Sequence, residues 1–342
     1  MQRLIYFIIP AFLYMSCSAQ QPQTPAETGI MFYNLENLFD TIDDPNTDDR
    51  IFLPDADRKW NTEKYQTKLK QMARVIAEGS GSLPMIVGLC EVENASVLDD
   101  LINEPALKNA HYAYVHFDSP DERGIDVAML YNTELFTVTS KQAIAVHLMQ
   151  GDSVDHTRDI LSVTGTIRGS DDIIQLFVNH WPSRSEGEEA SAWKRGEAAK
   201  TLKHAVDSVQ KAIKNPHIII MGDFNDTPFD KSIQEIVGAI PEGDNYPKNA
   251  LINLLANDQQ SGKGSYNYKG NWQALDQMIV SANLLDGKKL DIQTDATKWI
   301  QQDWMMFTHP SYGLSPNRTY SGTKWYGGFS DHLPVYTEIK VK

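Results

Sequence analysis

Short runs of apolar residues, separated by polar turns, recur along the chain from residue 30 onward. Continuous apolar runs predict strands over residues 30–33 and 85–90, and further strands are expected over residues 173–178 and 217–221. Other apolar segments predict strands near residues 112–117, 126–131, 136–147, 159–167, 275–280 and 333–341. The acidic, turn-rich stretch 41–60 predicts a long loop.

Two stretches show instead the spacing of an amphipathic helix. Asn61 and Thr62 are suited to begin the first helix, whose apolar residues follow at steps of four, three and four: Tyr65, Leu69, Met72 and Ile76. The second helix is expected over residues 188–214, with an apolar stripe formed by Ala199, Leu202, Val206, Val209 and Ile213. A shorter helix is expected near residues 95–108.

This alternation of strands and helices predicts an α/β fold. No internal repeat and no change of composition interrupts the chain after residue 29. We therefore expect one domain over residues 29–342, in which hairpins join strand pairs and the two longer helices cover sheet faces.

The first residues have the pattern of an export signal. Arg3 precedes an apolar stretch that Pro10 interrupts, and small residues follow it, so residues 1–19 are expected to be a signal peptide and not a membrane span. Cleavage before Cys17 would leave a cysteine for lipid attachment, whereas cleavage after Ala19 would leave none. We expect the lipoprotein, periplasmic or membrane-anchored, with residues 20–28 as a polar tether.

Composition narrows the class of protein further. The 342 residues are 41% hydrophobic and 22% charged, which excludes disordered and coiled-coil chains. Two cysteines cannot form a disulfide framework. The net charge of −14 disfavours a protein that coats nucleic acid electrostatically, but it leaves room for a local basic groove.

Polar clusters stand where the predicted strands begin or end. They are Asn34-Leu35-Glu36-Asn37, Glu91, Asn179-His180-Trp181, Gly222-Asp223-Phe224-Asn225-Asp226, Asp276 and Ser330-Asp331-His332. Each cluster alone is explained by a turn or a solvated strand end. Together they indicate a site at one rim of a sheet.

The motifs resemble those of the endonuclease/exonuclease/phosphatase superfamily. The similar segments are Asn34–Asn37, Gly88–Val92, Gly222–Asp226, Leu275–Ser281 and Ser330–His332, in the family's order from residue 30 to the C-terminus. Members include deoxyribonuclease I, abasic-site endonucleases, bacterial sphingomyelinases and inositol polyphosphate 5-phosphatases. The resemblance implies a four-layer α/β/β/α sandwich of two mixed sheets, with the site at one edge.

The resemblance also implies a divalent metal ion. Glu91 would be the main ligand, and Asn34 and Asp331 would complete the protein's contribution. A sparse set of oxygen ligands suits Mg²⁺, with Mn²⁺ as the alternative, because Mg²⁺ keeps several of its waters. The clustered His or Cys ligands of a zinc site are lacking.

The remaining motif residues would carry the chemistry. Asp223 would hold or activate the attacking water, and Asn225 would donate a hydrogen bond to the phosphate. His332, paired with Asp276, would act as general base or stabilise developing charge. His180 would contact phosphate and protonate the leaving group, with Glu122 or Asp126 as its partner. Arg123 is expected to contact the phosphate.

These residues predict an exported, Mg²⁺-dependent hydrolase of phosphodiester bonds, most plausibly nuclease-like and monomeric. Two alternatives stay open on the same fold. One is a phosphomonoesterase or a sphingomyelinase-like lipid phosphodiesterase, and the other is a non-catalytic surface binding protein. The substrate would be nucleic acid, a small phosphodiester or a lipid headgroup, and contact with a membrane would come only through the lipid anchor.

Other chemical features have ordinary structural explanations. Cys90 is expected to be a buried apolar residue and not a nucleophile. Tryptophans beside the segment 305–307 would form either a substrate rim or part of the core, and we expect the core. Arg184, Lys194 and Arg195 would either gather phosphate or solvate the start of a helix.

Overall fold

The computed structural model describes residues 27–342. The predicted signal peptide, both cleavage sites, Cys17 and most of the tether lie outside the described residues. The last two tether residues, Glu27 and Thr28, already belong to strand β1 (Glu27–Leu38). Between residues 27 and 342, no helix is long and apolar enough to cross a membrane.

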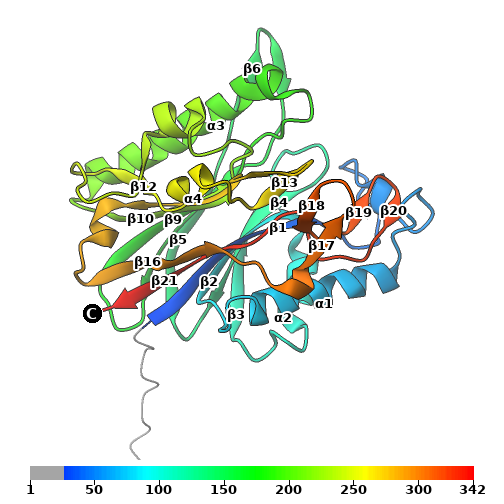
Figure 1. The fold of residues 1–342 in the computed structure, drawn as a ribbon, viewed down its shortest axis with the longest axis horizontal. Helices are drawn as coiled ribbons and strands as arrows, with labels where there is room; N and C mark the ends of the chain where they lie inside the picture. The colour runs from blue at the N-terminus through cyan, green and yellow to red at the C-terminus, as the bar shows by residue number, and fades with distance from the viewer. Residues whose placement is uncertain (1–26) are drawn as a thin grey trace, which may run out of the picture.

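Two large mixed sheets form the centre of the molecule (Figure 1). The first sheet consists, in spatial order, of β16 (Leu290–Trp299), β21 (Val335–Val341), β1, β2 (Ile86–Val92), β4 (Asp126–Asn132) and β3 (Tyr112–His116). The second consists of β11 (Ala239–Pro241), β12 (Leu251–Asn253), β15 (Asp276–Ser281), β10 (His217–Asp223), β9 (Ile173–His180), β8 (Ile160–Ile167) and β5 (Phe136–Ile144). In each sheet one central pair is parallel, β1 with β2 and β9 with β10.

Helices cover the outer face of each sheet. Helices α1 (Thr62–Glu78) and α2 (Ala95–Asn103) lie on the first sheet, and α3 (Glu188–Ala212) with the π-helix η2 (Ser232–Val237) lies on the second (Figure 1). The predicted α/β/β/α sandwich is confirmed. The short helices are α4 (Ala256–Gln260), η1 (Arg50–Phe52), η3 (Ala282–Leu285) and η4 (Asp303–Met305).

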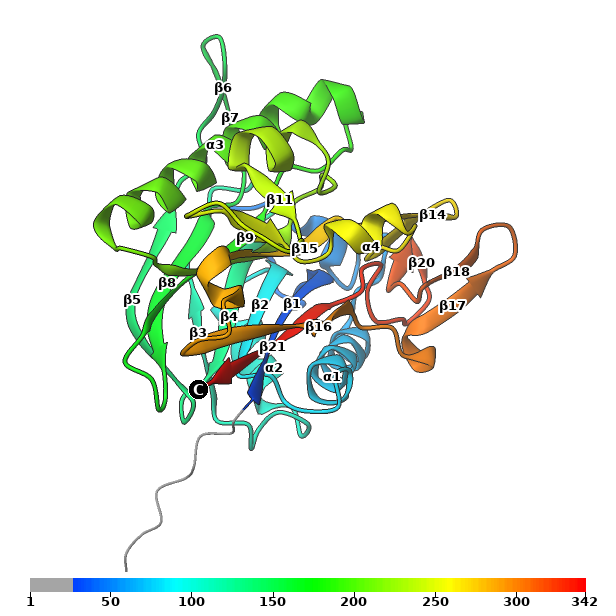
Figure 2. The same ribbon diagram turned by 60° about the vertical axis from the view of Figure 1, so that its left-hand side comes forward.

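Four short hairpins project from the sandwich. They are β6 (Leu148–Gln150) with β7 (Ser153–Asp155), β13 (Tyr266–Tyr268) with β14 (Asn271–Gln273), β17 (Met306–His309) with β18 (Gly313–Pro316), and β19 (Tyr320–Ser321) with β20 (Lys324–Trp325). The last three gather at one end of the molecule, as Figure 2 shows. The β6–β7 hairpin stands apart from them beside α3.

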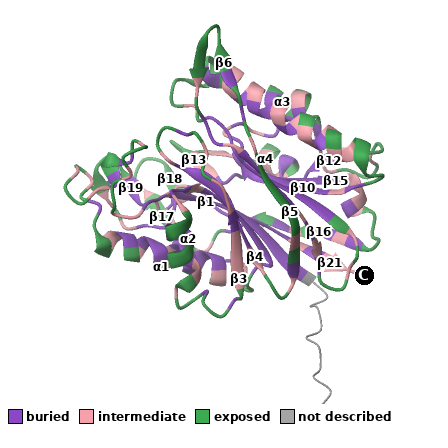
Figure 3. Cartoon of the chain, turned by 180° about the vertical axis from the view of Figure 1, so that it is seen from behind, coloured by how far each residue is buried: buried purple, intermediate pink, exposed green. Residues whose placement is uncertain are grey.

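The core explains why the central strands are apolar throughout. Ile30 and Phe32 of β1 are fully buried, and so is their neighbour Met31 on the opposite face. Both faces are covered because one meets helices and the other meets the second sheet. Gly88 of β2 lies against Met221 of β10, where an added Cβ would come within 2.6 Å of the sulfur. The buried strands are the purple centre of Figure 3.

Element boundaries differ from the predictions in two places. Helix α2 ends at Asn103, several residues early, because Pro105 disfavours helical geometry at Glu104, whose ψ is 142°. The strand predicted to reach residue 147 ends at Ile144, and the chain then forms the β6–β7 hairpin. Strand β16 was not predicted, because its apolar residues are interrupted by charged ones.

Close contact between β9 and β10 makes Gly222 sensitive to substitution. A Cβ at Gly222 would lie 2.5 Å from the carbonyl oxygen of Asn179. We expect Gly222→Ala to lower the free energy of unfolding by about 1–3 kcal/mol, because backbone must move to admit the methyl group. Gly243→Ala, at a position open to solvent, is the matched control. Equal urea midpoints for the two variants would contradict this packing.

Candidate active site

The register of the second sheet aligns three predicted catalytic residues. Asp223, the last residue of β10, pairs with His180 of β9 on one side and with Asp276 of β15 on the other. The polar ends of three strands therefore lie in one row at a single edge of the sheet. All three side chains are almost completely buried.

The first sheet brings its own polar ends to the same place. Asn34 of β1 pairs with Cys90 of β2, and pairing is interrupted directly after both residues. Beyond the break, Glu36, Asn37 and Glu91 adopt left-handed backbone angles, with φ of 49°, 62° and 60°. Such angles are unfavourable for residues other than glycine and concentrate at functional sites. Glu91 Oε1 then lies 3.8 Å from His180 Nε2 of the second sheet, whereas Glu36 accepts hydrogen bonds from the backbone of Thr319 and Tyr320.

Asp223 is the hub that joins the two sheets. Its Oδ2 accepts a hydrogen bond from Asn34 Nδ2 at 3.0 Å and lies 3.8 Å from His180 Nε2 and 3.9 Å from His332 Nε2. Its Oδ1 accepts a hydrogen bond from the backbone N–H of Asn225. Burial raises the pKa of Asp223 to about 6, against the opposing charge of His332. This carboxyl group can therefore exchange a proton near neutral pH.

His332 and Asp276 form the predicted pair. His332 Nδ1 lies 2.6 Å from Asp276 Oδ2. Burial favours the neutral ring, but the carboxylates of Asp276 and Asp223 outweigh it and raise the pKa of His332 well above its usual value. The Tyr266 ring, which the sequence did not single out, lies 4.9 Å from the imidazole, centre to centre. The two carboxylates therefore favour the charged form of the His332 ring.

His180 has a different environment. Its Nε2 lies 3.8 Å from both Glu91 Oε1 and Asp223 Oδ2, and its buried Nδ1 has no hydrogen-bond partner among residues 27–342. Burial lowers the pKa of His180 well below its usual value, and the charges of Arg158 and Arg123 lower it further. The neutral ring can donate one hydrogen bond to a phosphate oxygen.

The suggested carboxylate partners of His180 are wrong. Asp126 binds His116 instead, with 2.9 Å between Oδ2 and Nε2. Within 4 Å of His180, the carboxylates of the described chain are Glu91 and Asp223, so Glu122 is excluded as well. The sequence does not show which carboxylate lies beside which histidine, because that pairing depends on how distant segments fold together.

Arg158 is a further residue that the sequence did not reveal. Its guanidinium is buried, donates hydrogen bonds to the carbonyl oxygens of His180 and Trp181, and forms an ion pair with Asp121 at 2.8 Å. It therefore fixes the end of β9 at the site. Arg123 is about half exposed, bonds to Asp121 and lies at the rim. Its predicted contact with phosphate stays a prediction.

The predicted metal ligands meet at this edge. Burial raises the pKa of Glu91, opposed by Arg123 and reinforced by Asp331. Among the residues placed in the structure, no lysine or arginine forms an ion pair with Glu91 or Asp223. Carboxylates at a largely enclosed edge without a lysine or arginine partner fit a hard divalent ion, which binds carboxylate oxygen.

The other two predicted ligands make contacts of their own. The Oδ1 of Asn34 accepts a hydrogen bond from the backbone of Glu36, and its amide nitrogen faces Glu91 and Asp223. Asn34 thus orients the carboxylates, and its ligation of a metal stays a prediction that requires its oxygen to turn. Asp331 Oδ2 accepts a hydrogen bond from Arg318 at 2.5 Å, leaving Oδ1 for other contacts.

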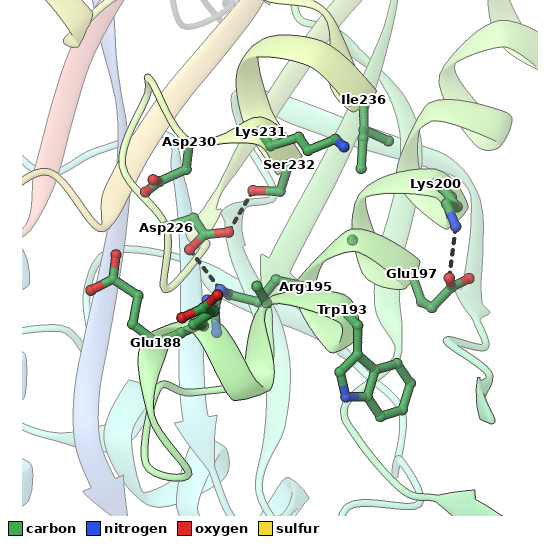
Figure 4. A pocket seen from close by; sticks show the side chains of 13 residues that line it. Glu188, Trp193, Arg195, Glu197, Lys200, Asp226, Asp230, Lys231, Ser232 and Ile236 are labelled. Atoms are coloured by element: carbon green, nitrogen blue, oxygen red, sulfur yellow. Dashed lines mark hydrogen bonds and ion pairs between the residues drawn. The ribbon is translucent and has the colours of Figure 1, made fainter. Parts of the chain in front are cut away.

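A buried network holds the loop after β10 in place (Figure 4). Arg195 of α3 donates a hydrogen bond to Asp226 at 2.6 Å, and Ser232 of η2 donates to the other oxygen of that carboxylate. Arg184 donates to the carbonyl oxygen of Asn225 and to Asp226. Arg184 and Arg195 therefore position Asn225, whereas Lys194 forms ion pairs with Asp155 and Glu186.

Asn225 and Cys90, both singled out in the sequence, differ in their environments. Asn225 has a φ of 50° and donates from its side chain to the carbonyl oxygen of Trp181, which points its amide toward the row of strand ends. Cys90 is a free, fully buried thiol, and burial raises its pKa, so the prediction of an apolar role is confirmed.

Comparison with known sequences places this geometry in context. A family model described as "Endonuclease/Exonuclease/phosphatase family" matches residues 29–341. No curated protein matches the chain.

Solved structures with the same fold cover nearly the whole chain. They include a D. rerio TDP2 humanised by 14 mutations, with 13% identity, a TM-score of 0.55, and coverage of 93% of this chain and 100% of that one. The human Nocturnin catalytic domain has 15% identity, a TM-score of 0.53, and coverage of 93% and 95%. A mannosyl-6-phosphatase of Bacteroides thetaiotaomicron has 17% identity, a TM-score of 0.53, and coverage of 91% and 99%. At these identities the likeness shows the fold.

The His332–Asp276 pair generates a test of the site's charge. We expect Asp276→Asn to lower the pKa of His332, because the substitution removes the largest contribution that favours the imidazolium. In the unchanged protein the ring should remain protonated through neutral pH. The measurement is a histidine NMR titration of the metal-free protein. Signals of His116, paired with Asp126, should stay in place as an internal control, and an unmoved His332 titration would contradict the pairing.

Proposed function

The chain belongs to the endonuclease/exonuclease/phosphatase family, and on this premise we propose that it is a divalent-metal-dependent phosphodiesterase with nuclease-like action. The observation that carries the proposal is the position of Asp223, whose Oδ2 lies within 4 Å of the Nε2 atoms of both His180 and His332. A surface binding protein has no need for two buried imidazoles beside a buried carboxylate. This arrangement suits hydrolysis.

The side chains divide the work by charge. Asp223, with a pKa raised to about 6, would orient the attacking water and accept its proton. The His332 imidazolium, held by Asp276, would stabilise the negative charge that develops on the phosphate oxygens. His180 and Asn225 would donate hydrogen bonds to the same phosphate, and Arg123 would contribute positive charge at the rim.

Glu91, with Asn34 and Asp331, would hold the metal ion. When bound, a divalent cation polarises the phosphoryl group and neutralises charge on its oxygens. Mg²⁺ is the ion we propose, with Mn²⁺ as the alternative, because the donors are oxygen atoms. The cation would also offset the negative charge of Glu91, whose Oε1 is otherwise approached by Asn34 Nδ2 and His180 Nε2.

We further propose that the protein acts outside the cytoplasm. The support is the signal-like pattern of residues 1–19 and the cysteine at position 17. Metabolic labelling with a fatty acid, compared between the unchanged chain and Cys17→Ser, tests the lipid anchor.

The catalytic assignment predicts a large loss of turnover in Asp223→Asn. The amide keeps the shape of the side chain but cannot accept a proton, so kcat should fall roughly 10²- to 10⁴-fold. Asp171→Asn, in the exposed turn between β8 and β9, is the matched control. Hydrolysis of bis-p-nitrophenyl phosphate in Mg²⁺ gives the rate. A kcat within threefold of the unchanged enzyme would remove Asp223 from the mechanism.

Metal dependence is tested on a panel of substrates, each with Mg²⁺ and with EDTA. We expect EDTA to abolish hydrolysis of bis-p-nitrophenyl phosphate and of DNA or RNA. Glu91→Gln should weaken metal binding measured by calorimetry, since it removes the ligand's charge. Faster hydrolysis of p-nitrophenyl phosphate or of sphingomyelin would favour the phosphomonoesterase or the lipid phosphodiesterase. Hydrolysis of none of them by the metal-bound protein would favour a binding protein.

A further inference from the structure

All exposed tyrosine and phenylalanine side chains of the described chain lie in one place. Tyr268, Phe307, Tyr312 and Tyr326 have 43–52% of their surface exposed, whereas every other described tyrosine, phenylalanine and tryptophan is buried or of intermediate exposure. The four line a single hollow of about 560 Å³. Its walls are the hairpins β13–β14, β17–β18 and β19–β20, which gather at one end of the molecule (Figures 1 and 2).

The rings are held but not covered. Tyr312 stacks on His309, with centroids 4.6 Å apart and an angle of 18° between the planes. Lys269 lies 5.0 Å above the Tyr268 ring, and Lys324 lies 4.7 Å above the Tyr326 ring. Asn267 joins the first hairpin to the second by donating a hydrogen bond to the Leu314 carbonyl oxygen. The hollow is therefore a platform of ordered rings with cations beside them.

The charge of this hollow contrasts with that of the whole chain. Its walls carry Lys269, Arg318 and Lys324 against a single carboxylate, Asp331, which Arg318 already binds. The protein as a whole has a net charge of −14. Cations next to the catalytic centre of an acidic protein favour an anionic ligand.

The hollow leads directly to the site. A second hollow, of about 210 Å³, shares Arg318, Ser321 and Asp331 with the first and is lined also by Glu91 and His332. There the Arg58 guanidinium lies over the rings of Phe52 and Tyr320, at 4.7 and 5.1 Å. It forms no hydrogen bond or ion pair with residues 27–342. The Arg318 Nε is buried, has no hydrogen-bond partner in that part of the chain and lies 3.7 Å from Glu36 Oε1.

We propose that the three hairpins form a binding groove for single-stranded nucleic acid, with bases stacked on the exposed rings and Arg58 and Arg318 contacting the phosphate next to the scissile one. This inference rests on the proposed function and names its substrate class. Paired bases are stacked inside a duplex and do not offer their faces to protein rings, whereas unpaired bases do. An uncharged sugar would use the rings but not the cations.

Binding is tested without catalysis, by fluorescence anisotropy in EDTA. The probes are a labelled single-stranded oligonucleotide, a strand of the same length without bases, and a duplex. The single strand with bases should bind most tightly. The double variant Phe307→Leu/Tyr312→Leu should bind that strand with an affinity at least tenfold lower, since each base stacked on a ring contributes roughly 5- to 100-fold to the affinity. Tyr312→Phe keeps the ring and should retain the affinity, and Ile173→Ala, an exposed residue at the start of β9, is the distant control.

The cations have a separate signature. The double variant Lys269→Gln/Lys324→Gln should lose affinity for the strand with bases and for the strand without bases to the same extent. The double substitution should also reduce the salt dependence of log K by about 0.7 per lost contact. Equal affinity for the two strands in the unchanged protein, or displacement of the strand by an uncharged oligosaccharide, would overturn the groove.

The two proposals fail in different ways. If the protein hydrolyses bis-p-nitrophenyl phosphate with Mg²⁺ but does not distinguish strands with and without bases, the groove is wrong and the phosphodiesterase stands. If it binds the single strand through the rings but hydrolyses nothing, the groove stands and the phosphodiesterase is wrong.

Discussion

The constraint that shapes this molecule is negative charge gathered at buried strand ends. Asp223 and Asp276 are almost completely buried and Glu91 is partly exposed, and an isolated buried carboxylate is strongly unfavourable. Two features offset this unfavourable charge. The carboxylates favour the charged form of His332, and Asn34 donates a hydrogen bond to Asp223. The positive charge still falls short, and a divalent cation would supply the remainder. The chemistry and the stability of this edge therefore depend on the same balance.

Another buried carboxylate, that of Glu36, lies close to this edge and connects it to the hairpins. Glu36 accepts hydrogen bonds from the backbone of Thr319 and Tyr320, so it ties β1 to the hairpin that carries the groove. Burial raises its pKa to about 7, and burial lowers the pKa of the nearby Lys68 to about 8. Lys68 is fully buried and donates to the Thr319 hydroxyl and to the Phe329 carbonyl oxygen. Catalytic edge and groove thus share one buried anchor.

The sequence predicted the parts of the structure that burial determines. Residues 218–221 are apolar because β10 is covered on both faces, and Asp223 stands out after such a run. The hairpins were not predicted from the sequence. Their strands have only two to four residues, with exposed aromatic and polar side chains, and are too short to show an alternation of apolar and polar positions. Arg158 and Tyr266 escaped it for another reason. Their roles come from contacts between distant segments, which one sequence does not display.

The residues proposed for hydrolysis lie on the buried strand ends, whereas those proposed for substrate binding lie on the exposed hairpins. A substitution at Asp223 or Asp276 alters a buried, mutually dependent set of charges, so the sandwich leaves little freedom there. Tyr268, Phe307 and Tyr312 are exposed, and exposed positions tolerate substitution with small changes in stability. A fold built in this way can keep one hydrolytic centre while its hairpins adapt to different leaving groups. In the proposed groove, the substrate would therefore be selected mainly by the hairpin rings, with Arg58 and Arg318 between these rings and the catalytic residues.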